Sequence, residues 1–589
     1  MPTEAWLTTA RAVAALPPSS FERLWVASDR RTRDELVRMR CRFDIGFFAK
    51  WCWPSTFGRP WNPAHHHLLA PVDPPASARA RTALRATAAP RGIAKTTIAK
   101  ARLAHALVFG LDRCCLVVSA ERELAAAISD DLRGWFVEEG SELARLFAPQ
   151  VRAPTAPGRR PARRARGPRP AAEADPRKGT KGPFLVRGGK LRWSMLGWEG
   201  VLCGVIAKSF GTQVRGSNIA GHRPSRMVVD DGERPDRVAS ARQRARAQQF
   251  LDDDILKAGP SAGDGGLVVE WVGTVLHPDA ILARLLKHPG WDARRFAAVI
   301  RWPDRADLWE ACRAVWADLT LGPLEVREAA ARRFYADRRA EMDAGAELLD
   351  PVAVPLFAVY LIIWSQGMRS VLRELQNEPR DPTAALFDSA RFARCRLERD
   401  REDEVIIAAD GRRVRLADCQ VRGRWDPALG EGDGDFAALA VIAFDRFGFG
   451  FLLQVWMRRA RPSAQLEALW AIAERWGMRR VSLESNGFQA MLANDFARMQ
   501  RERREAGRFW QLQVIAEPST DDKVARIASL DVPLTAGWLQ VHPAGVPPEV
   551  LAQFDDFPNG DHDDGPDAVE GCWARRPGHG PQMVEERRR

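Results

Sequence analysis

The sequence predicts an α/β protein with two α/β units, the first of them built on a mainly parallel sheet. Short apolar runs typical of buried strands alternate with helix-length stretches from about residue 83, and a second such series begins near residue 421. Helix-length connections between successive strands favour parallel pairing, because parallel neighbours need a crossover. The 589 residues are enough to bury several cores.

The composition is basic, with 88 Lys and Arg against 76 Asp and Glu and a formal net charge of +12. A basic surface gains affinity for polyanions by releasing their counterions, so this balance favours a nucleic-acid partner. A GC-rich coding sequence explains the excess of Arg equally well. The nine cysteines form no CxxC pair and the N-terminus has no secretory character, which indicates a reduced, intracellular protein. The longest apolar run, 351–364, is too short to cross a membrane.

Changes in composition and periodicity divide the chain into segments. Residues 151–182 are rich in Pro, Arg and Gly and nearly lack large apolar side chains, so we expect a disordered insertion there. The predicted segments are an N-terminal helical region (1–60), a first α/β unit (61–385) that contains the insertion, a connector (386–420), a second α/β unit (421–572) and a disordered basic tail (573–589).

A candidate phosphate-binding loop of the Walker A kind, PRGIAKTT, lies between the first strand and the first helix of the first unit. Such loops hold phosphates with backbone N–H groups, a Lys and a Ser or Thr whose hydroxyl binds Mg²⁺. Lys95 and Thr96 fit these side-chain roles, but Ala89 and Ala94 stand where glycines are usual, so the match alone is weak. The candidate nucleotide-binding residues of this loop are Pro90, Arg91, Gly92, Ala94, Lys95, Thr96 and Thr97.

A later strand of the same unit, RMVVDDGE, ends in acids, as a Walker B strand does. Carboxylates at the carboxyl edge of a parallel sheet can hold Mg²⁺ and orient an attacking water. Asp230 is the candidate metal ligand, and either Asp231 or Glu233 is the candidate water-orienting acid. Thr274 follows the next strand and is a further candidate nucleotide contact. An acidic turn after a buried strand is the plainer interpretation.

Acids also follow two strands and begin one late helix of the second unit. Metal-dependent phosphodiester cleavage needs carboxylates that converge from separate segments to hold two cations. Each acid alone is more often a solvated surface charge, so the prediction depends on the set. The candidate metal ligands are Asp426, Glu484, Asp563 and Asp564, with Asp564 ranked before Asp563 and both before Asp567. Asp435 either supports the ligands without touching the metal or is an alternative ligand, and His562 either assists the metal or caps a turn.

The order of these motifs resembles the large terminase subunit of tailed phages. PRGIAKTT, GTQVRG, GHRPSRMVVDDGE, VGTVLHPD and LRELQNEPRDP resemble its ATPase half, and VSLESNGFQ, DKVARI and FPNGDHDDGPDA resemble its nuclease half. The resemblance extends from about residue 60 to 572, apart from the insertion. The family's phosphate loop often lacks glycines and carries an Arg, which implies a role for Arg91 as a finger on the γ-phosphate.

The resemblance implies an ASCE-type P-loop ATPase followed by a ribonuclease-H-like nuclease. It implies ATP and Mg²⁺ as motor cofactors, and Mg²⁺ or Mn²⁺, as two ions, in the nuclease, with Lys95, Asp426, Glu484 and Asp564 as catalytic residues. The implied function is ATP-driven translocation of double-stranded DNA into the procapsid and cutting of concatemeric DNA. The implied partners are the portal protein, the small terminase subunit and further copies in a pentameric ring, in the cytoplasm of the bacterial host and transiently at the procapsid portal.

Two alternatives belong to other classes. A DNA translocase or helicase–nuclease of repair or defence would carry a fuller set of helicase motifs, and none is found. An inactive prophage remnant that only binds DNA is disfavoured by the acids kept in both units. The sequence leaves open which phage or prophage is involved and whether packaging is site-specific or headful.

Overall fold

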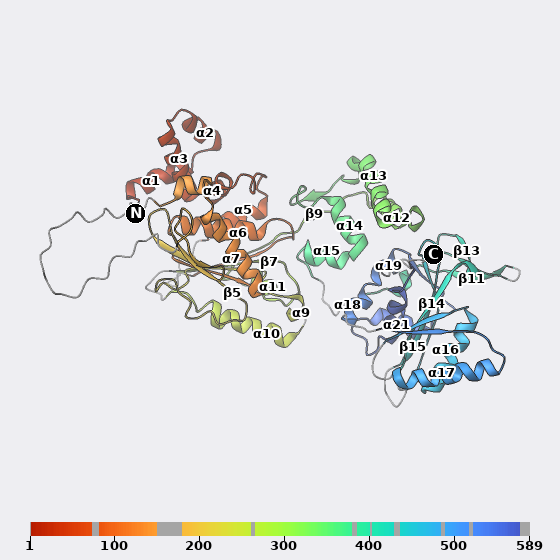
Figure 1. The fold of residues 1–589 in the computed structure, drawn as a ribbon. Helices are drawn as coiled ribbons and strands as arrows, with labels where there is room; N and C mark the ends of the chain where they lie inside the picture. The colour runs from red at the N-terminus through yellow and green to blue at the C-terminus, as the bar shows by residue number, and fades with distance from the viewer. Residues whose placement is uncertain are drawn as a thin grey trace, which may run out of the picture. The chain divides into compact units, whose positions relative to one another are not determined.

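A computed structural model shows a chain that divides into two compact units (Figure 1). It describes residues 2–72, 82–149, 180–238, 240–260, 266–379, 386–400, 403–428, 436–484, 489–517 and 522–577. Unit 1 comprises Met1–Arg301, Glu347–Leu356 and Val371–Arg380, and unit 2 comprises Trp302–Ala346, Phe357–Ser370 and Asp381–Arg589. Residues 302–346, which we expected in the first α/β unit, therefore cluster with the second. Most of the predicted insertion and tail lies outside the described residues.

The N-terminal region of unit 1 is helical, as the sequence predicts. Side chains of Thr3, Asp29 and Asp44 accept hydrogen bonds from backbone N–H groups in the first turns of the helices they precede, which explains where these helices begin. The helices are α1 (Glu4–Ala14), α2 (Pro18–Val26), α3 (Arg30–Phe43), α4 (Ile45–Cys52) and α5 (Pro63–Leu69).

The core of unit 1 is an eight-stranded sheet in the order β3-β4-β5-β2-β6-β7-β1-β8. Every neighbouring pair from β5 to β8 is parallel, whereas the pairs β3–β4 and β4–β5 are antiparallel. The mainly parallel sheet predicted from the sequence is confirmed. Its strands are β1 (Thr82–Ala88), β2 (Cys114–Ser119), β3 (Arg187–Gly189), β4 (Arg192–Leu196), β5 (Leu202–Ser209), β6 (Arg226–Asp230), β7 (Leu267–Gly273) and β8 (Asp292–Arg295).

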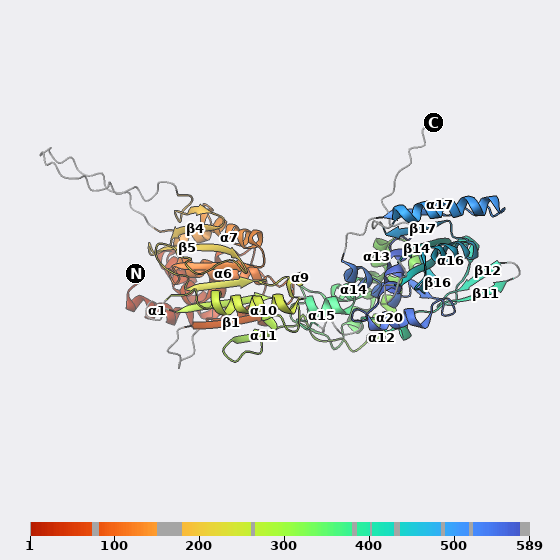
Figure 2. The ribbon, with the colours of Figure 1, turned by 90° about the horizontal axis from the view of Figure 1, so that it is seen from below.

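Helices cover both faces of this sheet, so its strands are apolar on both sides. Along β2, Cys115 and Val117 face a cluster with α3, α4, α6 and α7, while Leu116 and Val118 face a cluster with the α10 region and α11. Figure 2 shows α10 running alongside the sheet. The covering elements are α6 (Lys95–Val108), α7 (Arg122–Val137), α8 (Glu142–Phe147), α9 (Pro235–Val238), α10 (Ala241–Phe250), the π-helix η1 (Leu251–Ile255) and α11 (Ile281–Leu285).

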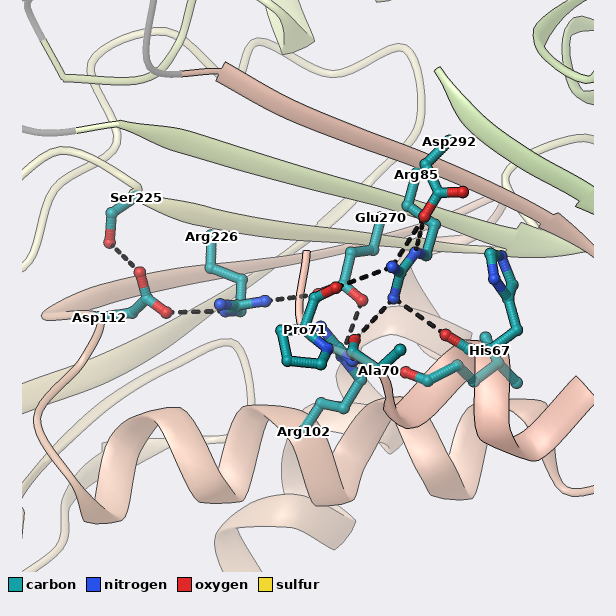
Figure 3. A network of polar contacts seen from close by, with 11 residues as sticks. His67, Ala70, Pro71, Arg85, Arg102, Asp112, Ser225, Arg226, Glu270 and Asp292 are labelled. Atoms are coloured by element: carbon teal, nitrogen blue, oxygen red, sulfur yellow. Dashed lines mark hydrogen bonds and ion pairs between the residues drawn. The ribbon is translucent and has the colours of Figure 1, made fainter. Parts of the chain in front are cut away.

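A buried polar network fixes α6 against the sheet (Figure 3). Glu270 on β7 is 2% exposed and binds Arg102 of α6 at 2.7 Å and Arg226 of β6 at 2.5 Å. Burial would raise the pKa of Glu270, but the two guanidinium groups outweigh it and lower this pKa. Arg85 on β1 donates to the carbonyl of His67 in α5 and to the carbonyls of Ala70 and Pro71 just after this helix. These contacts tie α6 to β6 and β7, and tie β1 to the end of α5.

The remaining elements before residue 380 lie in both units. β9 (Val299–Arg301) pairs antiparallel with β10 (Glu347–Leu348) in unit 1. Unit 2 contains α12 (Ala306–Ala317), the 3₁₀ turn η2 (Leu319–Leu321) and α13 (Leu324–Met342), and most of α14 (Leu356–Gln366); α15 (Met368–Glu374) runs from unit 2 into unit 1. Trp309 of α12 stacks on Tyr360 of α14 with ring centroids 3.7 Å apart. This aromatic packing joins these helices within unit 2.

Unit 2 is built on a six-stranded mixed sheet in the order β18-β17-β14-β15-β16-β19. β14, β15 and β16 form an antiparallel meander, and β17, β18 and β19 add to it in parallel. The strands are β14 (Gln420–Asp426), β15 (Ala437–Phe444), β16 (Gly450–Arg458), β17 (Arg480–Glu484), β18 (Gln513–Glu517) and β19 (Leu539–Val541). The predicted order of strands and helices from 421 to 517 is confirmed, and β19 is additional.

Helices pack on both faces of this second sheet. Along β15, alternate residues join a cluster with α20 and α21 or a cluster with α16. The helices are α16 (Pro462–Arg475), α17 (Gln489–Glu505), α18 (Lys523–Ala528), α19 (Asp531–Thr535), α20 (Pro548–Asp556) and α21 (Asp564–Trp573). Among the described residues, no helix is both long and apolar enough to span a bilayer.

The predicted connector has more structure than the sequence suggested. It forms a three-stranded antiparallel sheet of β11 (Arg396–Asp400), β12 (Asp403–Ile407) and β13 (Arg413–Arg415), flanked by the 3₁₀ turns η3 (Ser389–Arg391) and η4 (Leu416–Asp418). Ile406 is fully buried in the cluster that contains Trp425 and Trp470. The segment therefore belongs to the core of unit 2, and its charge-rich strands concealed this in the sequence.

Candidate nucleotide and metal sites

The loop between β1 and α6 has the backbone of a phosphate-binding loop although two expected glycines are missing. Gly92 has φ 89° and Ala94 has φ 60°, both in the left-handed region. Glycine adopts this region freely, whereas alanine does so at some steric cost. A Cβ at Gly92 would meet nothing within 4 Å, so the space beside the loop is open. The sequence obscured this loop because Ala94 adopts a conformation normally left to glycine.

Lys95 is the first residue of α6 and is 8% exposed. Its Nζ donates to the carbonyl oxygens of Ala89 at 2.8 Å and Pro90 at 3.0 Å, and lies 3.4 Å from Oγ1 of Thr274. Burial lowers the pKa of Lys95, against the opposing effect of the charges on Asp231 and Asp230. The ammonium group thus lies inside the loop that would surround a phosphate. Three predicted contacts, Pro90, Lys95 and Thr274, are brought together here.

Thr96 and Asp230 meet although 134 residues separate them. The Thr96 hydroxyl donates to Oδ2 of Asp230 at 2.7 Å, and the other carboxylate oxygen is buried without a hydrogen-bond partner among the described residues. Burial, with repulsion from Asp231, raises the pKa of Asp230 to about 6. A hydroxyl beside an unsatisfied carboxylate oxygen is a donor set that fits Mg²⁺, which prefers oxygen ligands. The residues present therefore fit the predicted metal.

Asp231 and Glu233, which the sequence could not rank, have different surroundings. Both carboxylate oxygens of Glu233 accept backbone hydrogen bonds, from Ile281 N at 2.9 Å and Leu282 N at 3.2 Å, so Glu233 caps α11. Burial raises the pKa of Glu233. Asp231 is exposed, has φ 43°, and follows Asp230 directly at the end of β6. Asp231 is therefore the acid still available to a reacting water.

The phosphate loop and the turn after β7 are braced by Glu374 and Asn377 from the LRELQNEPRDP segment, and by His65, which the sequence did not single out. The backbone N–H of Arg91 donates to the carbonyl of Glu374, and Oδ1 of Asn377 accepts from Val275 N at 3.0 Å. His65 of α5 lies 2.8 Å from the carbonyl oxygen of Ile93 through Nε2. No local pattern could have revealed these contacts, because the partners of each lie far apart along the chain. Arg91 is exposed at the loop, and Thr97 lies in the first turn of α6.

In unit 2, Asp426 and Glu484 end neighbouring parallel strands. Trp425 of β14 is in register with Leu483 of β17, so the two acids follow paired residues at the same edge of the sheet. The side chain of Glu484 and all of Asp435 lie outside the described residues. The backbone thus brings the segments that carry Asp426 and Glu484 to the same edge of the sheet.

The acids of the late helix α21 are joined by two cations that the sequence analysis did not rank. Lys523 Nζ lies 2.7 Å from Asp563 and 3.4 Å from Asp567, and Arg526 lies 3.0 Å from both Asp567 and Glu570. Burial would lower the pKa of Lys523, but Asp563, Asp567 and Asp426 together raise it. Asp563 and Asp567 are thus both engaged by cations. The signal was present in DKVARI, which was noted only as a motif.

Asp564 is 6% exposed at the start of α21, and His562 Nδ1 lies 3.8 Å from its Oδ2. The His562 ring also packs edge-on against Phe436. Among the side chains that the structure describes, no three His, Cys, Asp or Glu residues are grouped as a metal site.

The comparisons with known proteins agree with this location. Residues 423–568 match the family described as the terminase RNaseH-like domain. A search of the curated proteins found no match to this chain. The match confirms the ribonuclease-H-like fold predicted for the second unit.

Solved structures give weaker likenesses. The large terminase from a thermophilic bacteriophage, in its second crystal form, is 9% identical with a TM-score of 0.34, covering 87% of this chain and 98% of that one. The large terminase nuclease from thermophilic phage G20c is 18% identical with a TM-score of 0.22 (32% and 98% covered), and the human cytomegalovirus terminase nuclease domain is 13% identical with a TM-score of 0.21 (26% and 81% covered). These TM-scores are all below 0.5 and do not by themselves establish a shared fold. The match to the family described as the terminase RNaseH-like domain is the finding that identifies residues 423–568, and it shows that unit 2 contains a ribonuclease-H-like domain of the terminase type.

Proposed function

We propose that the chain hydrolyses ATP to move double-stranded DNA into a viral procapsid, and that it cuts concatemeric DNA with divalent metal ions. One observation supports the motor assignment above all. Lys95, Thr96 and Asp230 come together at the carboxyl edge of a parallel sheet, with a buried carboxylate oxygen of Asp230 left unsatisfied among the described residues. The terminase domain behind this unit supports DNA as the substrate.

In the motor, ATP would supply the phosphoryl group, and Mg²⁺ would neutralise the negative charge on the phosphates. Lys95 would exchange its bonds to the loop carbonyls for bonds to phosphate oxygens, and Thr96 and Asp230 would hold the metal. Asp231 would orient the attacking water, because Glu233 is used as a helix cap. Arg91 would stabilise charge that develops on the γ-phosphate. Thr274, beside Lys95, would link the nucleotide to β7.

In the nuclease, two Mg²⁺ or Mn²⁺ ions would activate water and stabilise the leaving oxygen. Asp426, Glu484, Asp563 and Asp564 would hold these ions, with Lys523 positioned to neutralise the crowded acids. Asp563 would then exchange its ion pair with Lys523 for a metal.

We further propose the partners that this function requires. These are double-stranded DNA, the portal protein, the small terminase subunit and further copies in a ring, pentameric by family resemblance, that act in the cytoplasm of the bacterial host at the procapsid portal. A repair or defence translocase would share both chemistries but would need neither the portal nor the procapsid.

The decisive experiment measures ATP hydrolysis by the full chain with and without linear double-stranded DNA, comparing Lys95→Ala with Lys100→Ala. Lys100 lies on the same helix and pairs with Asp131 at 3.2 Å. Lys100→Ala therefore removes the same charge from α6 and serves as the matched control. We expect Lys95→Ala to lower turnover by roughly two or more orders of magnitude, because it removes the main side-chain contact to the phosphates. Lys100→Ala should retain activity. Near-normal hydrolysis by a folded Lys95→Ala protein would refute the motor assignment.

A further inference from the structure

Arginines gather on the two helices that follow the metal-binding strand of unit 1. Between residues 234 and 250 the chain has five arginines and a single acid, Asp236. Helix α10 has no acid at all and buries none of its residues. We call this surface of α9 and α10 the α10 face; its exposed arginines are Arg237, Arg242 and Arg246.

The three arginines of the α10 face have no ion pair with any residue that the structure describes. Their neighbours are already engaged: Arg234 pairs with Glu121 at 2.6 Å, and Arg244 donates to the Val238 carbonyl at 2.7 Å. The acids that follow in η1 have contacts of their own. Asp252 accepts from Gln248 at 3.2 Å, Asp253 pairs with Lys257 at 2.6 Å, and Asp254 lies 3.9 Å from Arg215.

Other arginine-rich helices of this chain behave differently. On α13, Arg332 pairs with Glu328 at 2.9 Å and Arg339 with Asp343 at 3.2 Å, each four residues apart. That is a solvated face of mixed charge, which is what a GC-rich coding bias alone would produce. The α10 face lacks such compensation among the described residues.

The placement of these arginines opposes the stability of α10. Arg242 lies in the first turn, where the helix dipole disfavours positive charge. Arg242 and Arg246 are four residues apart, so two like charges are neighbours on one side of the helix. Both costs disappear when an anion binds across the first turns of the helix. A bound polyanion would therefore stabilise this surface.

The α10 face also borders a hollow of about 390 Å³ next to the motor site. Its lining includes Arg237, Arg244 and Arg246, with Phe210 and Phe250 on the apolar side and Gly232 and Glu233 from the loop after β6. Within unit 1, α10 lies on the side of the sheet away from α1–α4 (Figure 1). Along the chain, the arginines of the α10 face begin at Arg237, shortly after Asp230 and Asp231, and continue through α10 to Arg246.

We propose that the α10 face binds the phosphate backbone of double-stranded DNA. The inference rests on the proposed function for its partner and adds the surface that receives it. Arginine contacts to phosphates hold a duplex without reading its sequence, as a translocating motor requires. The short loop from Asp230 to Arg234 connects this contact to the acids of the nucleotide site. DNA held on α10 would accelerate ATP hydrolysis through that loop.

The test compares the full chain with the triple variant Arg237→Gln, Arg242→Gln, Arg246→Gln. The matched control is Arg332→Gln, Arg333→Gln, Arg339→Gln on α13, which removes the same charge. Binding of a short labelled DNA duplex is measured by fluorescence anisotropy in EDTA over a range of salt concentrations. We expect the α10 variant to bind about tenfold or more weakly and its salt slope to fall by about two to three, since each lost phosphate contact lowers the slope by about one. The control should match the unchanged chain.

Two further measurements keep the proposal falsifiable. A triple Arg→Lys variant at the same positions should retain the salt slope, because charge rather than shape is required; loss of the slope in that folded variant would contradict the proposal. Without DNA, the glutamine variant should hydrolyse ATP as the unchanged chain does, but DNA should no longer stimulate it. An unchanged salt slope in the glutamine variant would overturn the proposal. Binding of polyglutamate, an acidic polypeptide, is measured as well: a glutamine variant that loses polyglutamate binding but keeps DNA binding would also overturn the proposal, because the surface would then receive an acidic protein. If the unchanged chain has no ATPase activity, the proposed motor function is wrong. The salt dependence of DNA binding would still test whether the α10 face binds DNA.

Discussion

At the scale of single residues, the most informative group is the Asp230 carboxylate. It is 4% exposed, one oxygen receives the Thr96 hydroxyl, and the other has no hydrogen-bond partner among the described residues. A buried acceptor left unsatisfied is costly, and a buried negative charge more so. A cation bound at this carboxylate would satisfy the second oxygen and offset the cost, and such perturbed buried carboxylates are typical of functional sites.

This cost predicts a pH-dependent effect of Asp230→Asn on stability. Folding raises the pKa of Asp230 from 3.8 to about 6, so ionised Asp230 destabilises the fold above about pH 6 and not below pH 3.8. Asn keeps an acceptor for Thr96 and carries no charge. In EDTA at pH 8 the variant should gain roughly 1–3 kcal/mol in the free energy of unfolding, measured with urea. The gain should shrink as the pH falls toward 4, and equal stability of the two proteins at pH 8 would show that the buried charge is not the source of the cost.

At the scale of elements, the loop after β6 assigns different tasks to two nearby acids. Asp231 stays beside Asp230 at the sheet edge, whereas Glu233 turns away to the N-terminus of α11. The exposed N–H groups of a helix start need acceptors, and a carboxylate supplies them well. One acid is thus available for chemistry and the other holds the loop in place.

Substitution of the two acids should separate these tasks. Asp231→Asn should slow single-turnover ATP hydrolysis by about 10²–10⁴-fold while nucleotide affinity remains, because the group that orients the water is lost. Glu233→Gln should keep hydrolysis within a few-fold and lower the free energy of unfolding by about 1 kcal/mol, because one cap bond weakens. Rapid-quench hydrolysis, calorimetric nucleotide titration and urea unfolding measure the three quantities. The reverse pattern would assign the water to Glu233.

At the scale of the whole molecule, the candidate residues for each proposed chemistry lie within one compact unit. Lys95 and Asp230 belong to unit 1, and Asp426, Glu484 and α21 belong to unit 2. Unit 2 nevertheless includes α12, α13 and most of α14, which precede the connector in sequence. The Trp538 side chain next to β19, for example, donates to the carbonyl of Ala317 at the end of α12 at 2.8 Å. Helices of the segment expected to belong to the motor thus complete the unit that carries the nuclease.

Independent units predict independent loss of function. Asp426→Ala should abolish cutting of plasmid DNA in Mn²⁺, because a metal ligand is lost, and should leave ATP hydrolysis unchanged. Asp418→Ala removes an exposed acid from the same unit and serves as the control, with both activities retained. Agarose gels and a phosphate-release assay report the two activities. Loss of ATPase with cutting intact would show that the division of chemistry between units is wrong.

The sequence predicted the elements whose signals are local. Apolar runs located β1, β2, β6 and β7, and the alternation of strands and helices after residue 420 gave nearly the whole order of unit 2. Lys95, Thr96 and Asp230 could be proposed because strand, loop and helix place such residues by short-range geometry. The same reasoning failed for the connector, whose strands β11 and β12 carry charges on one side and are stabilised by burial of the other against distant residues.

Only the tertiary structure decided the contacts between distant segments. Nothing near Glu233 in sequence shows that it caps α11, 48 residues away, and nothing near Lys523 shows that it joins Asp563 and Asp567. The sequence likewise could not show that Ala94 adopts the left-handed backbone conformation of a glycine, or that α12 belongs to unit 2. Local patterns record propensity and amphipathicity, which depend on near neighbours. The partners of a polar side chain are selected by the packing of the whole chain, because each buried donor and acceptor must find its match there.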